Sequence, residues 1–433
     1  MIQTDRQILR IALPSIVSNI TVPLLGLVDL AIVGHLGNAV YIGAIAVGSM
    51  IFNVIYWVFG FLRMGTSGMT SQALGNRNLA EVLRILVRSM TVGLMVAAVI
   101  LFFQSSVRSA AFLIIRPTAD IRAAASSYFD ICVWGAPAML GLYSLSGWFI
   151  GMQNTRIPMF ISIMQNIVNI AASLTLVFVV GMKVEGVATG TLIAQYAGLA
   201  VGVLLLLHYY GRLGRYWNMT GVFLRSALWR FFRVNGDIFV RTLFIVSVNF
   251  YFLSAGAAQG KILLAVNTLL MQLFTLFSYV MDGFAYAGEA LCGRYYGAGN
   301  KPAFRLAIRR LFVWGVWLTV GYTVVYALGG QPFLRLLTDN ESVIAASASY
   351  LPWAVAIPAA GVAAFVWDGV FIGITATHYM LIASVIAAVT FFLLYFSLFP
   401  IWGNHALWLA FIVYLFMRGA VQSVMMTVSR IWR

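Results

Sequence analysis

Five carboxylates lie inside long apolar stretches of this sequence, where an ionised side chain is unfavourable. They are Asp29, Asp130, Asp282, Glu289 and Asp368. In a membrane interior such a charge costs about 2.5 kcal/mol or more, so it usually pairs with another group or marks a pathway for ions or substrate. Asp130 stands in a polar turn and Glu289 near the end of an apolar stretch, so both also have a structural interpretation. Asp29, Asp282 and Asp368 sit deeper and are the first candidates for chemistry.

Other polar residues are expected at the depth of Asp29, which stands in the stretch "PLLGLVDLAIVG". Asn166, Asn169 and Ser173 are spaced i, i+3 and i+7 and share one helix face. At 1.5 Å rise per residue, Asp29, Ser173 and Thr191 lie at depths within roughly 5 Å of each other, with Asn169 about one turn deeper. A carboxylate with amide and hydroxyl oxygens beside it can hold a proton or a hard cation. Helix–helix hydrogen bonding is the alternative role for the uncharged members.

The apolar surroundings of Asp29 favour its neutral, protonated form, because a low dielectric disfavours charge. A carboxyl group that takes up and releases a proton is what a proton-coupled carrier requires. Pro14 and Pro23 each remove a backbone hydrogen bond from the same predicted helix. We therefore expect this helix to bend.

The composition indicates an integral membrane protein. Hydrophobic residues make up 62% of the chain and charged residues 9%, with a mean hydropathy of +0.94, whereas a soluble domain carries about 25% charged residues. The apolar runs are long and continuous, which predicts helices rather than the strands of a β-barrel. The net charge of +15 comes from basic residues in short loops, which argues against nucleic-acid binding. Cys132 and Cys292 fall in or beside apolar segments and indicate neither disulfides nor a metal site.

Twelve segments are long and apolar enough to span a membrane. They cover roughly residues 8–33, 41–66, 85–106, 122–151, 157–181, 186–209, 233–256, 262–290, 305–328, 344–373, 379–401 and 405–428. The longer connection 210–232 is first basic and then amphipathic, which is typical of a segment on the cytoplasmic membrane face. With a cytoplasmic N-terminus, 18 basic residues fall at inner loops and span ends and 6 at outer ones. The positive-inside rule therefore places both termini in the cytoplasm.

The two halves of the sequence resemble each other at a constant offset. "SGWFIGMQNT" at 146–155 matches "DGVFIGITAT" at 368–377, a shift of 222 residues that also superposes Arg88 on Arg310 and Gly34 on Gly256. Six spans per repeat is an even number, so both copies keep the same orientation. We expect one lobe of residues 1–209, the linker 210–232 and a second lobe of residues 233–433. Transporters built in this way bind substrate between their halves and alternate access.

Five motifs carry a resemblance to a known family. They are "NITVPLLGLVDLAIVGHL", "FLRMGTSGMTSQALG", "MDGFAYAGEALCGRYYGAG", "DGVFIG" and "GNHALWLA". Together they resemble the DinF-like branch of the MATE (multidrug and toxic compound extrusion) transporters, over nearly the whole chain. The resemblance implies twelve transmembrane helices in two six-helix lobes that form a V, and export coupled to inward H⁺ or Na⁺. It further implies that Asp29 is the coupling residue of the first lobe and that helix 1 bends at Pro14. Asn169, Thr191 and Tyr128 match further members of the polar network.

One position departs from the pattern of the family. Relatives often carry a second acid in an N-x-x-N-x-x-x-D pattern, where this sequence has Ser173. A dehydrated Na⁺ would then have only Asp29 to balance its charge, whereas a proton needs only one carboxylate. The sequence therefore favours H⁺, while a weak Na⁺ site at Asp29, Asn169 and Thr191 stays open.

The resemblance also draws attention to acids of the second lobe. Asp282 and Asp368 match acids of the DinF-like branch, and with Glu289 they are candidates for a second coupling or substrate site.

We therefore expect a secondary antiporter that exports organic cations or amphipathic toxic compounds, with protonation of Asp29 as the coupling event and no cofactor. It is expected to act as a monomer in the bacterial inner membrane, with lipids and small molecules as partners and no nucleic acid. A flippase for a lipid-linked or amphipathic metabolite is the alternative. Such flippases line their cavity with several basic residues, and apart from arginines counted with the span ends only Arg63, Arg241 and Arg418 lie within the expected spans. No nucleophile elbow, zinc spacing or paired His–Asp signature indicates an enzyme.

Overall fold

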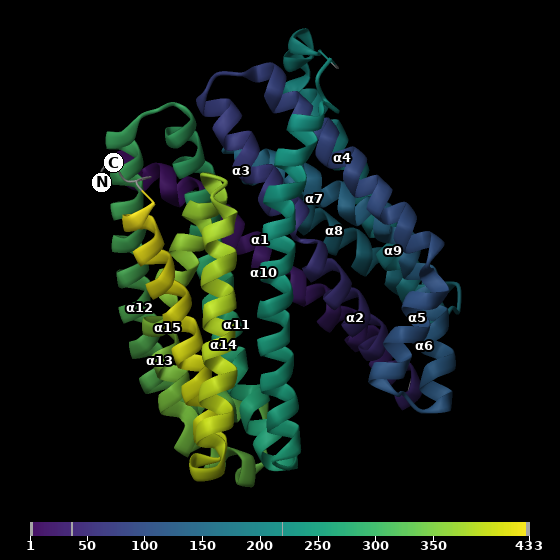
Figure 1. The fold of residues 1–433 in the computed structure, drawn as a ribbon. Helices are drawn as coiled ribbons and strands as arrows, with labels where there is room; N and C mark the ends of the chain where they lie inside the picture. The colour runs from purple at the N-terminus through teal and green to yellow at the C-terminus, as the bar shows by residue number, and fades with distance from the viewer. Residues whose placement is uncertain (1–2, 36–37, 219, 430–433) are drawn as a thin grey trace. The chain divides into compact units, whose positions relative to one another are not determined.

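The computed structural model describes residues 3–35, 38–218 and 220–429, so the two chain ends, which we expect in the cytoplasm, lie outside the described residues. In this part the chain forms fifteen α-helices and no strand, with two 3₁₀ helices and one π-helical turn (Figure 1). The elements are α1 (Gln3–Gly34), α2 (Ala39–Phe59), α3 (Phe61–Gly75), α4 (Leu79–Phe102), α5 (Gln104–Ile115), α6 (Ala119–Cys132), η1 (Val133–Gly135), α7 (Ala136–Gly151), α8 (Arg156–Leu174), η2 (Thr175–Val179), α9 (Val184–Tyr210), η3 (Gly211–Tyr216), α10 (Arg225–Ala258), α11 (Lys261–Gly297), α12 (Lys301–Leu337), α13 (Glu341–Gly373), α14 (Thr377–Trp402) and α15 (Asn404–Val428).

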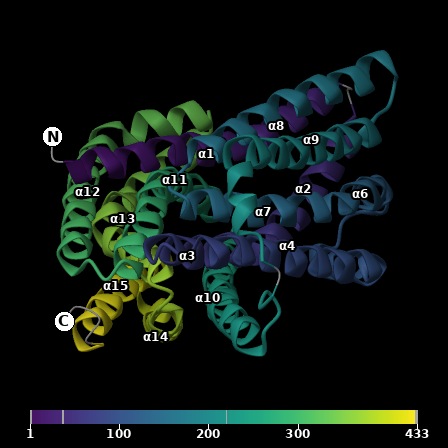
Figure 2. The ribbon, with the colours of Figure 1, turned by 90° about the horizontal axis from the view of Figure 1, so that it is seen from above.

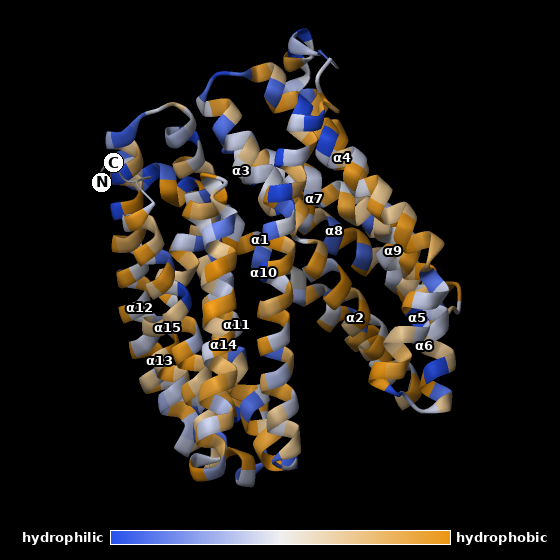
Figure 3. Cartoon of the chain, viewed as in Figure 1, coloured by the Kyte–Doolittle hydropathy of each residue, from blue (hydrophilic) through white to orange (hydrophobic). Residues whose placement is uncertain are grey.

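The expectation of an all-helical membrane protein is confirmed. Eleven helical segments of the described chain are long and apolar enough to cross a membrane, and apolar residues dominate the middle of the long helices (Figure 3). The expected span at 122–151 is built differently, from α6, the 3₁₀ turn η1 and α7. Pro137 stands in the first turn of α7 and has no backbone N–H to continue the preceding helix, which accounts for the interruption.

Several helices extend beyond the predicted spans. α10 begins at Arg225 rather than at residue 233, and α12 continues to Leu337 rather than ending at 328. The predicted outer loop after residue 106 contains most of α5. Arginine, leucine and glutamine are good helix formers, but charged and polar ends lower the hydropathy by which a span is recognised. Hydropathy therefore marks the apolar part of each helix and not its full length.

The chain divides into two compact units that exchange the starts of their first helices. The N-unit is Leu13–Phe232, and the C-unit combines Met1–Ala12 with Arg233–Arg433. Helix α1 thus begins in the C-unit and continues in the N-unit, while α10 begins in the N-unit and continues in the C-unit. The expected first lobe included residues 1–12, and the expected linker 210–232 here belongs to the N-unit.

Each unit is organised around one central helix. In the C-unit, α13 packs against α11, α12 and α15 (Figure 2). In the N-unit, α7 packs against α3, α4 and α9. These two helices carry the matching motifs at 146–155 and 368–377, so the sequence repeat marks the centre of each unit.

Glycines of this motif permit the same close packing in both units. A Cβ atom at Gly147 would lie 2.2 Å from the carbonyl oxygen of Arg63 in α3. A Cβ atom at Gly369 would lie 2.3 Å from the carbonyl oxygen of Ala285 in α11. Both the glycines and the residues that they contact are 222 positions apart. The repeat therefore preserves a helix–helix contact, and any larger side chain at these glycines would separate the helices.

Candidate functional site

Three helices of the N-unit bring the central candidates together. Asp29 in α1 is 2% exposed. The Thr191 hydroxyl in α9 donates to Asp29 Oδ2 at 3.4 Å, and the Asn169 amide in α8 donates to Thr191 Oγ1 at 3.0 Å. Asp29, Asn169 and Thr191 thus form one buried chain of hydrogen bonds, named here the Asp29 cluster. Each member comes from a different helix, so the cluster responds to any change in the packing of α1, α8 and α9.

Close packing of α8 against α9 positions the Asp29 cluster. A Cβ atom at Gly190 would lie 2.3 Å from Ser173 Oγ and 2.8 Å from the backbone nitrogen of Ser173. Glycine is therefore required at the position next to Thr191, and Ser173 is fully buried against it. Ser173 lies one helical turn from Asn169 and belongs to the wall of the cluster.

A second contact joins α1 to α8 at another level. The hydroxyl oxygens of Thr21 and Ser162 are 2.7 Å apart, about two turns away from Asp29 and the cluster. Asn166 belongs to this level, because its amide donates to the carbonyl oxygen of Ser162 at 3.0 Å. The shared helix face that the sequence predicts for Asn166 thus spans two contacts, and Asn166 bonds within α8 beside the contact that is distant from the carboxylate.

No basic side chain pairs with Asp29 among the described residues. Asp29 Oδ1, Asn169 Oδ1 and Ser173 Oγ are buried and have no hydrogen-bond partner in the described part of the chain. A buried carboxyl group without a counter-charge favours its neutral form. The arrangement therefore suits the uptake and release of a proton.

The same oxygens are the atoms that a bound cation would need. Carboxylate, amide and hydroxyl oxygens are ligands of hard cations, and those of Asp29, Asn169 and Ser173 fit this chemistry for Na⁺. Within the described residues, no group of three or more His, Cys, Asp or Glu side chains is placed to hold a metal ion. The cluster therefore supplies a single negative charge.

Tyr128 borders the Asp29 cluster from α6. Its ring packs against Gly48 in α2, where a Cβ atom would lie 2.3 Å from the ring, and its side chain is 4% exposed. Tyr128 and Cys132 both lie near Asp29. Cys132, whose thiol points to the carbonyl oxygen of Ala188 at 3.7 Å, is a neighbour that sequence reasoning treated only as a small buried residue. The sequence could have indicated this position, because Cys132 follows Tyr128 by four residues and so lies on the same helix face.

Two backbone features accompany the cluster. Pro14 and Pro23 both lie inside α1, which stays helical from Gln3 to Gly34. Helix α8 passes directly into the π-helical turn Thr175–Val179, two residues after Ser173. Such turns often occur at functional sites. The prolines are visible in the sequence, whereas nothing in its composition reveals the π-helical turn.

In the C-unit, Asp368 is held by three side chains. Arg241 in α10 forms an ion pair with its carboxylate. Arg418 Nη2 in α15 donates to Asp368 Oδ2 at 2.5 Å, and Gln422 Nε2 donates to Oδ1 at 2.6 Å. Arg418 and Gln422 are four residues apart and share one face of α15. Two guanidinium groups and one amide therefore bind the carboxylate of Asp368.

The other candidate acids of the C-unit lie on α11. Asp282 is half-buried and lies near Arg241. Glu289 lies about two turns further along the helix and is 1% exposed. The structure thus pairs Asp368 with Arg241, and it places Asp282 near this pair and Glu289 further along α11. Asp130, the fifth acid of the apolar stretches, is exposed and pairs with Arg108.

Comparisons with known proteins agree with this architecture. The MatE family model matches residues 14–175 and 238–396. DNA damage-inducible protein F of Escherichia coli (strain K12) is 36% identical over 434 residues, which covers 99% of this chain and 92% of that protein. A crystal structure of a MATE protein in the bent conformation has a TM-score of 0.88 at 18% identity, covering 99% of this chain and 96% of the other. An outward-facing multidrug resistance MATE family transporter of the MOP superfamily has a TM-score of 0.86 at 17% identity, with coverage of 99% and 96%.

The two structural matches show the shared fold, and the family model and the near-full-length relative identify the family. The resemblance carried by the sequence motifs is thereby confirmed. The chain belongs to the MATE family of transporters.

Proposed function

We propose that this protein is a secondary antiporter that exports amphipathic or cationic small molecules in exchange for inward protons. Its family and the multidrug-resistance transporter that shares its fold support this substrate class. The observation that carries the coupling proposal is Asp29, a buried carboxyl group without an ion pair among the described residues. The concentration of basic residues in alternate loops supports a place in the bacterial cytoplasmic membrane with both termini inside.

The proposed coupling step changes one charge inside the N-unit. In the ionised state, Asp29 accepts a hydrogen bond from Thr191, which in turn accepts one from Asn169. A proton arriving from outside neutralises the carboxylate and weakens the hold of α9 on α1. Helix α1 then repacks at Pro14 and Pro23, where its backbone hydrogen bonds are missing. Substrate is released outward if it binds the protonated state less tightly, because only differential binding can drive the change.

We favour H⁺ over Na⁺ because the cluster holds a single carboxylate. A proton on Asp29 cancels the whole charge of the cluster. Na⁺ would need Asp29 Oδ1 with the neutral oxygens of Asn169 and Ser173, and it would lose its water shell for one negative ligand. Because these oxygens have no hydrogen-bond partner among the described residues, Na⁺ coupling is the alternative that the experiment must distinguish from H⁺ coupling.

The relatives described above give no support to the flippase alternative. Arg241 and Arg418, two of the three arginines in the expected spans, are both engaged with Asp368. Both guanidinium groups are therefore committed to a carboxylate inside the C-unit, which argues against a role in holding a lipid phosphate.

The experiment that tests this proposal is transport in proteoliposomes under imposed gradients. Ethidium, a fluorescent organic cation, serves as the transported probe, and either a pH gradient or a Na⁺ gradient is imposed. We expect the pH gradient alone to drive transport by the wild type. Asp29→Asn should abolish it, and the control Asp120→Asn, at an exposed acid in the first turn of α6, should leave it unchanged. Transport driven only by Na⁺, or undiminished in Asp29→Asn, would contradict the proposal.

A further inference from the structure

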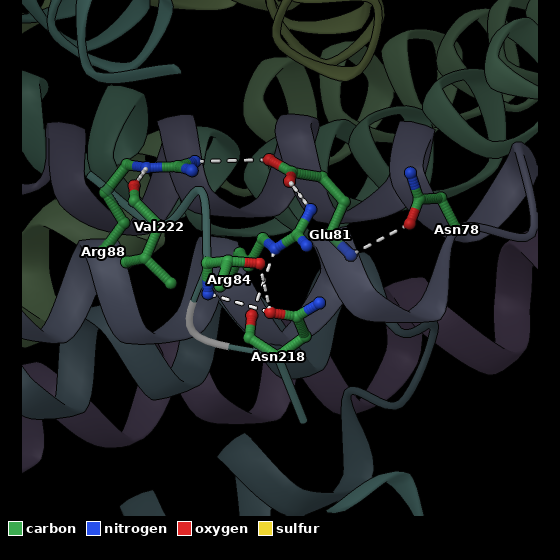
Figure 4. Close-up of polar contacts among 7 residues, drawn as sticks. Asn78, Glu81, Arg84, Arg88, Asn218 and Val222 are labelled. Carbon is green, nitrogen blue, oxygen red and sulfur yellow. Dashed lines mark hydrogen bonds and ion pairs between the residues drawn. The ribbon is translucent and has the colours of Figure 1, made fainter. Parts of the chain in front are cut away.

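A polar cavity lies in the N-unit outside the Asp29 cluster. Its volume is about 360 Å³, and α3, α4 and the start of α10 line it. The polar lining includes Gln72, Glu81, Arg88 and Arg230. Figure 4 shows the α4 side of this region, where Glu81 and Arg88 face each other. We refer to this space as the Arg88 cavity.

Arg88 is buried and only partly satisfied. The side chain is 2% exposed, its Nε donates to the carbonyl oxygen of Val222 at 2.8 Å, and its Nη1 donates to Glu81 Oε1 at 3.3 Å (Figure 4). Its Nη2 has no hydrogen-bond partner among the described residues. A buried charged donor without an acceptor is unfavourable. An acceptor in the adjoining cavity would remove this penalty.

The charges around the Arg88 cavity favour an anion. Glu81 is shared between Arg88 and Arg84, whose Nη1 lies 3.7 Å from Glu81 Oε2. Arg230 adds a third guanidinium group, and its Nη2 donates to the neutral Gln72 Oε1 at 2.9 Å. Two guanidinium groups thus share one carboxylate, and Arg230 adds a third that donates to a neutral amide. The excess positive charge suits a ligand with several anionic oxygens, such as phosphate.

The C-unit shows how the equivalent arginine is satisfied. Arg310, 222 residues after Arg88, also borders a cavity, of about 500 Å³. Its Nε and Nη2 donate to the two carboxylate oxygens of Asp5 at 2.9 and 2.6 Å. Trp314 Nε1 donates to the same carboxylate at 3.2 Å. In this unit the chain itself supplies the anion that the arginine binds.

The N-unit lacks this internal carboxylate. The residue 222 positions after Asp5 is Ala227, which lines the Arg88 cavity. The helix starts are equivalent, since Asn78 and Asn300 cap α4 and α12 through the same side-chain bond at 3.0 Å. The start of α1 therefore supplies a carboxylate to Arg310, whereas the start of α10 supplies none to Arg88, whose carboxylate partner is Glu81 of its own helix.

We propose that the Arg88 cavity binds a phosphate group, held by Arg88 and Arg230 in the role that Asp5 plays for Arg310. The phosphate belongs either to a lipid headgroup or to a free anion. The chain segment that carries Arg230 also carries exposed apolar residues, with Trp229 70% and Leu224 60% exposed. In a membrane protein this places apolar surface for acyl chains next to a phosphate-binding group, as a headgroup site requires.

The test measures ligand binding to the full chain, purified in detergent micelles, by microscale thermophoresis. The probes are inorganic phosphate, dihexanoyl phosphatidylglycerol and, as a phosphate-free control, dihexanoylglycerol. Ala227→Asp supplies the missing carboxylate within the chain, and Arg230→Gln removes one guanidinium group. The matched control is Arg225→Gln, which makes the same change in net charge at an exposed residue outside the cavity lining.

We expect the phosphate-bearing probes to bind the wild type and dihexanoylglycerol not to bind. Ala227→Asp and Arg230→Gln should each weaken binding by about tenfold or more, while Arg225→Gln leaves it unchanged. If only dihexanoyl phosphatidylglycerol binds, the phosphate group belongs to a lipid headgroup. If inorganic phosphate binds equally well, the ligand is the free anion. Absence of binding by both phosphate probes, or binding by Ala227→Asp at wild-type affinity, would overturn the proposal. Because Ala227→Asp adds only a small side chain in the first turn of α10, an acidic residue there is compatible with the helix.

Discussion

At the scale of single residues, two buried carboxylates of this transporter differ in their neighbours. Asp29 meets one hydroxyl donor at 3.4 Å, whereas Asp368 meets two guanidinium groups and an amide. A buried carboxylate with cationic partners stays charged, and one without them is readily neutralised. The same residue type therefore suits proton exchange in the N-unit and helix attachment in the C-unit.

This contrast predicts a large loss of stability when Asp368 is replaced and little change when Asp29 is replaced. Asp368→Asn leaves Arg241 and Arg418 buried without their counter-charge, which should lower the free energy of unfolding by about 3–5 kcal/mol. Asp29→Asn breaks no ion pair and keeps the side-chain shape, so it should change the melting temperature little. Thermal unfolding of both variants in the same detergent measures the difference. Equal melting temperatures would show that the arginines do not depend on Asp368.

The sequence predicts these two sites to different extents. Depth along the predicted spans places Asp29, Ser173 and Thr191 within roughly 5 Å of each other and Asn169 about one turn deeper, but it does not show that their helices are neighbours. The partners of Asp368 are not predictable in this way. Arg241 and Arg418 lie 127 and 50 residues away from it, and only the packing of α10 and α15 against α13 joins them. Hydropathy indicates how deep a residue lies in the membrane, but it does not show how its helix is rotated or which helices lie beside it.

At the scale of elements, the contact between α8 and α9 sets the geometry of the Asp29 cluster. The Cβ position of Gly190 lies within 3 Å of the Ser173 backbone nitrogen and hydroxyl. Backbone atoms cannot move aside as the end of a flexible side chain can. The two helices therefore hold Asn169 and Thr191 in contact only while residue 190 has no side chain.

Gly190→Ala should therefore separate α8 from α9 and weaken both stability and transport. Overpacking of this kind costs about 1–3 kcal/mol. Gly236→Ala in α10 is the control, since nothing lies within 4 Å of its Cβ position, and alanine there should be neutral or slightly stabilising. Melting temperature and ethidium transport are measured for both. Equal behaviour of the two variants would refute the importance of the Gly190 contact.

Helix boundaries were predicted less well than helix existence. The 3₁₀ turn at Val133–Gly135 and the early start of α10 at Arg225 both differ from the predicted spans. In each case backbone hydrogen bonding, rather than hydropathy, decides where the helix ends. Pro137 indicated the first difference, whereas the basic start of α10 was interpreted as a linker because it is not apolar.

At the scale of the whole molecule, the constant offset of 222 residues describes both units. It relates the packing of Gly147 and Gly369, the caps Asn78 and Asn300, and the arginines that bind the exchanged helix starts. The exchange itself was not predicted. Hydropathy identifies which residues are apolar, but it does not show which unit the first turns of α1 and α10 join.

The charge distribution predicts the orientation of the molecule in the membrane. Cys132 and Cys292 are 2% and 0% exposed, so they should give little background with a membrane-impermeant maleimide. Asp120→Cys should be labelled in intact cells, whereas Arg215→Cys in η3 should be labelled only after permeabilisation. Both positions are exposed in the structure. The reverse pattern of labelling would invert the proposed topology.

The most direct test of the central claim is substrate-induced proton flux in proteoliposomes. A pH dye is enclosed in the lumen, ethidium is added, and the change of lumenal pH is recorded for the wild type, Asp29→Asn and Asp120→Asn. Asp29 as the coupling carboxyl predicts that ethidium moves protons in the wild type and in Asp120→Asn, and moves none in Asp29→Asn. Proton flux of wild-type size in Asp29→Asn would contradict the claim.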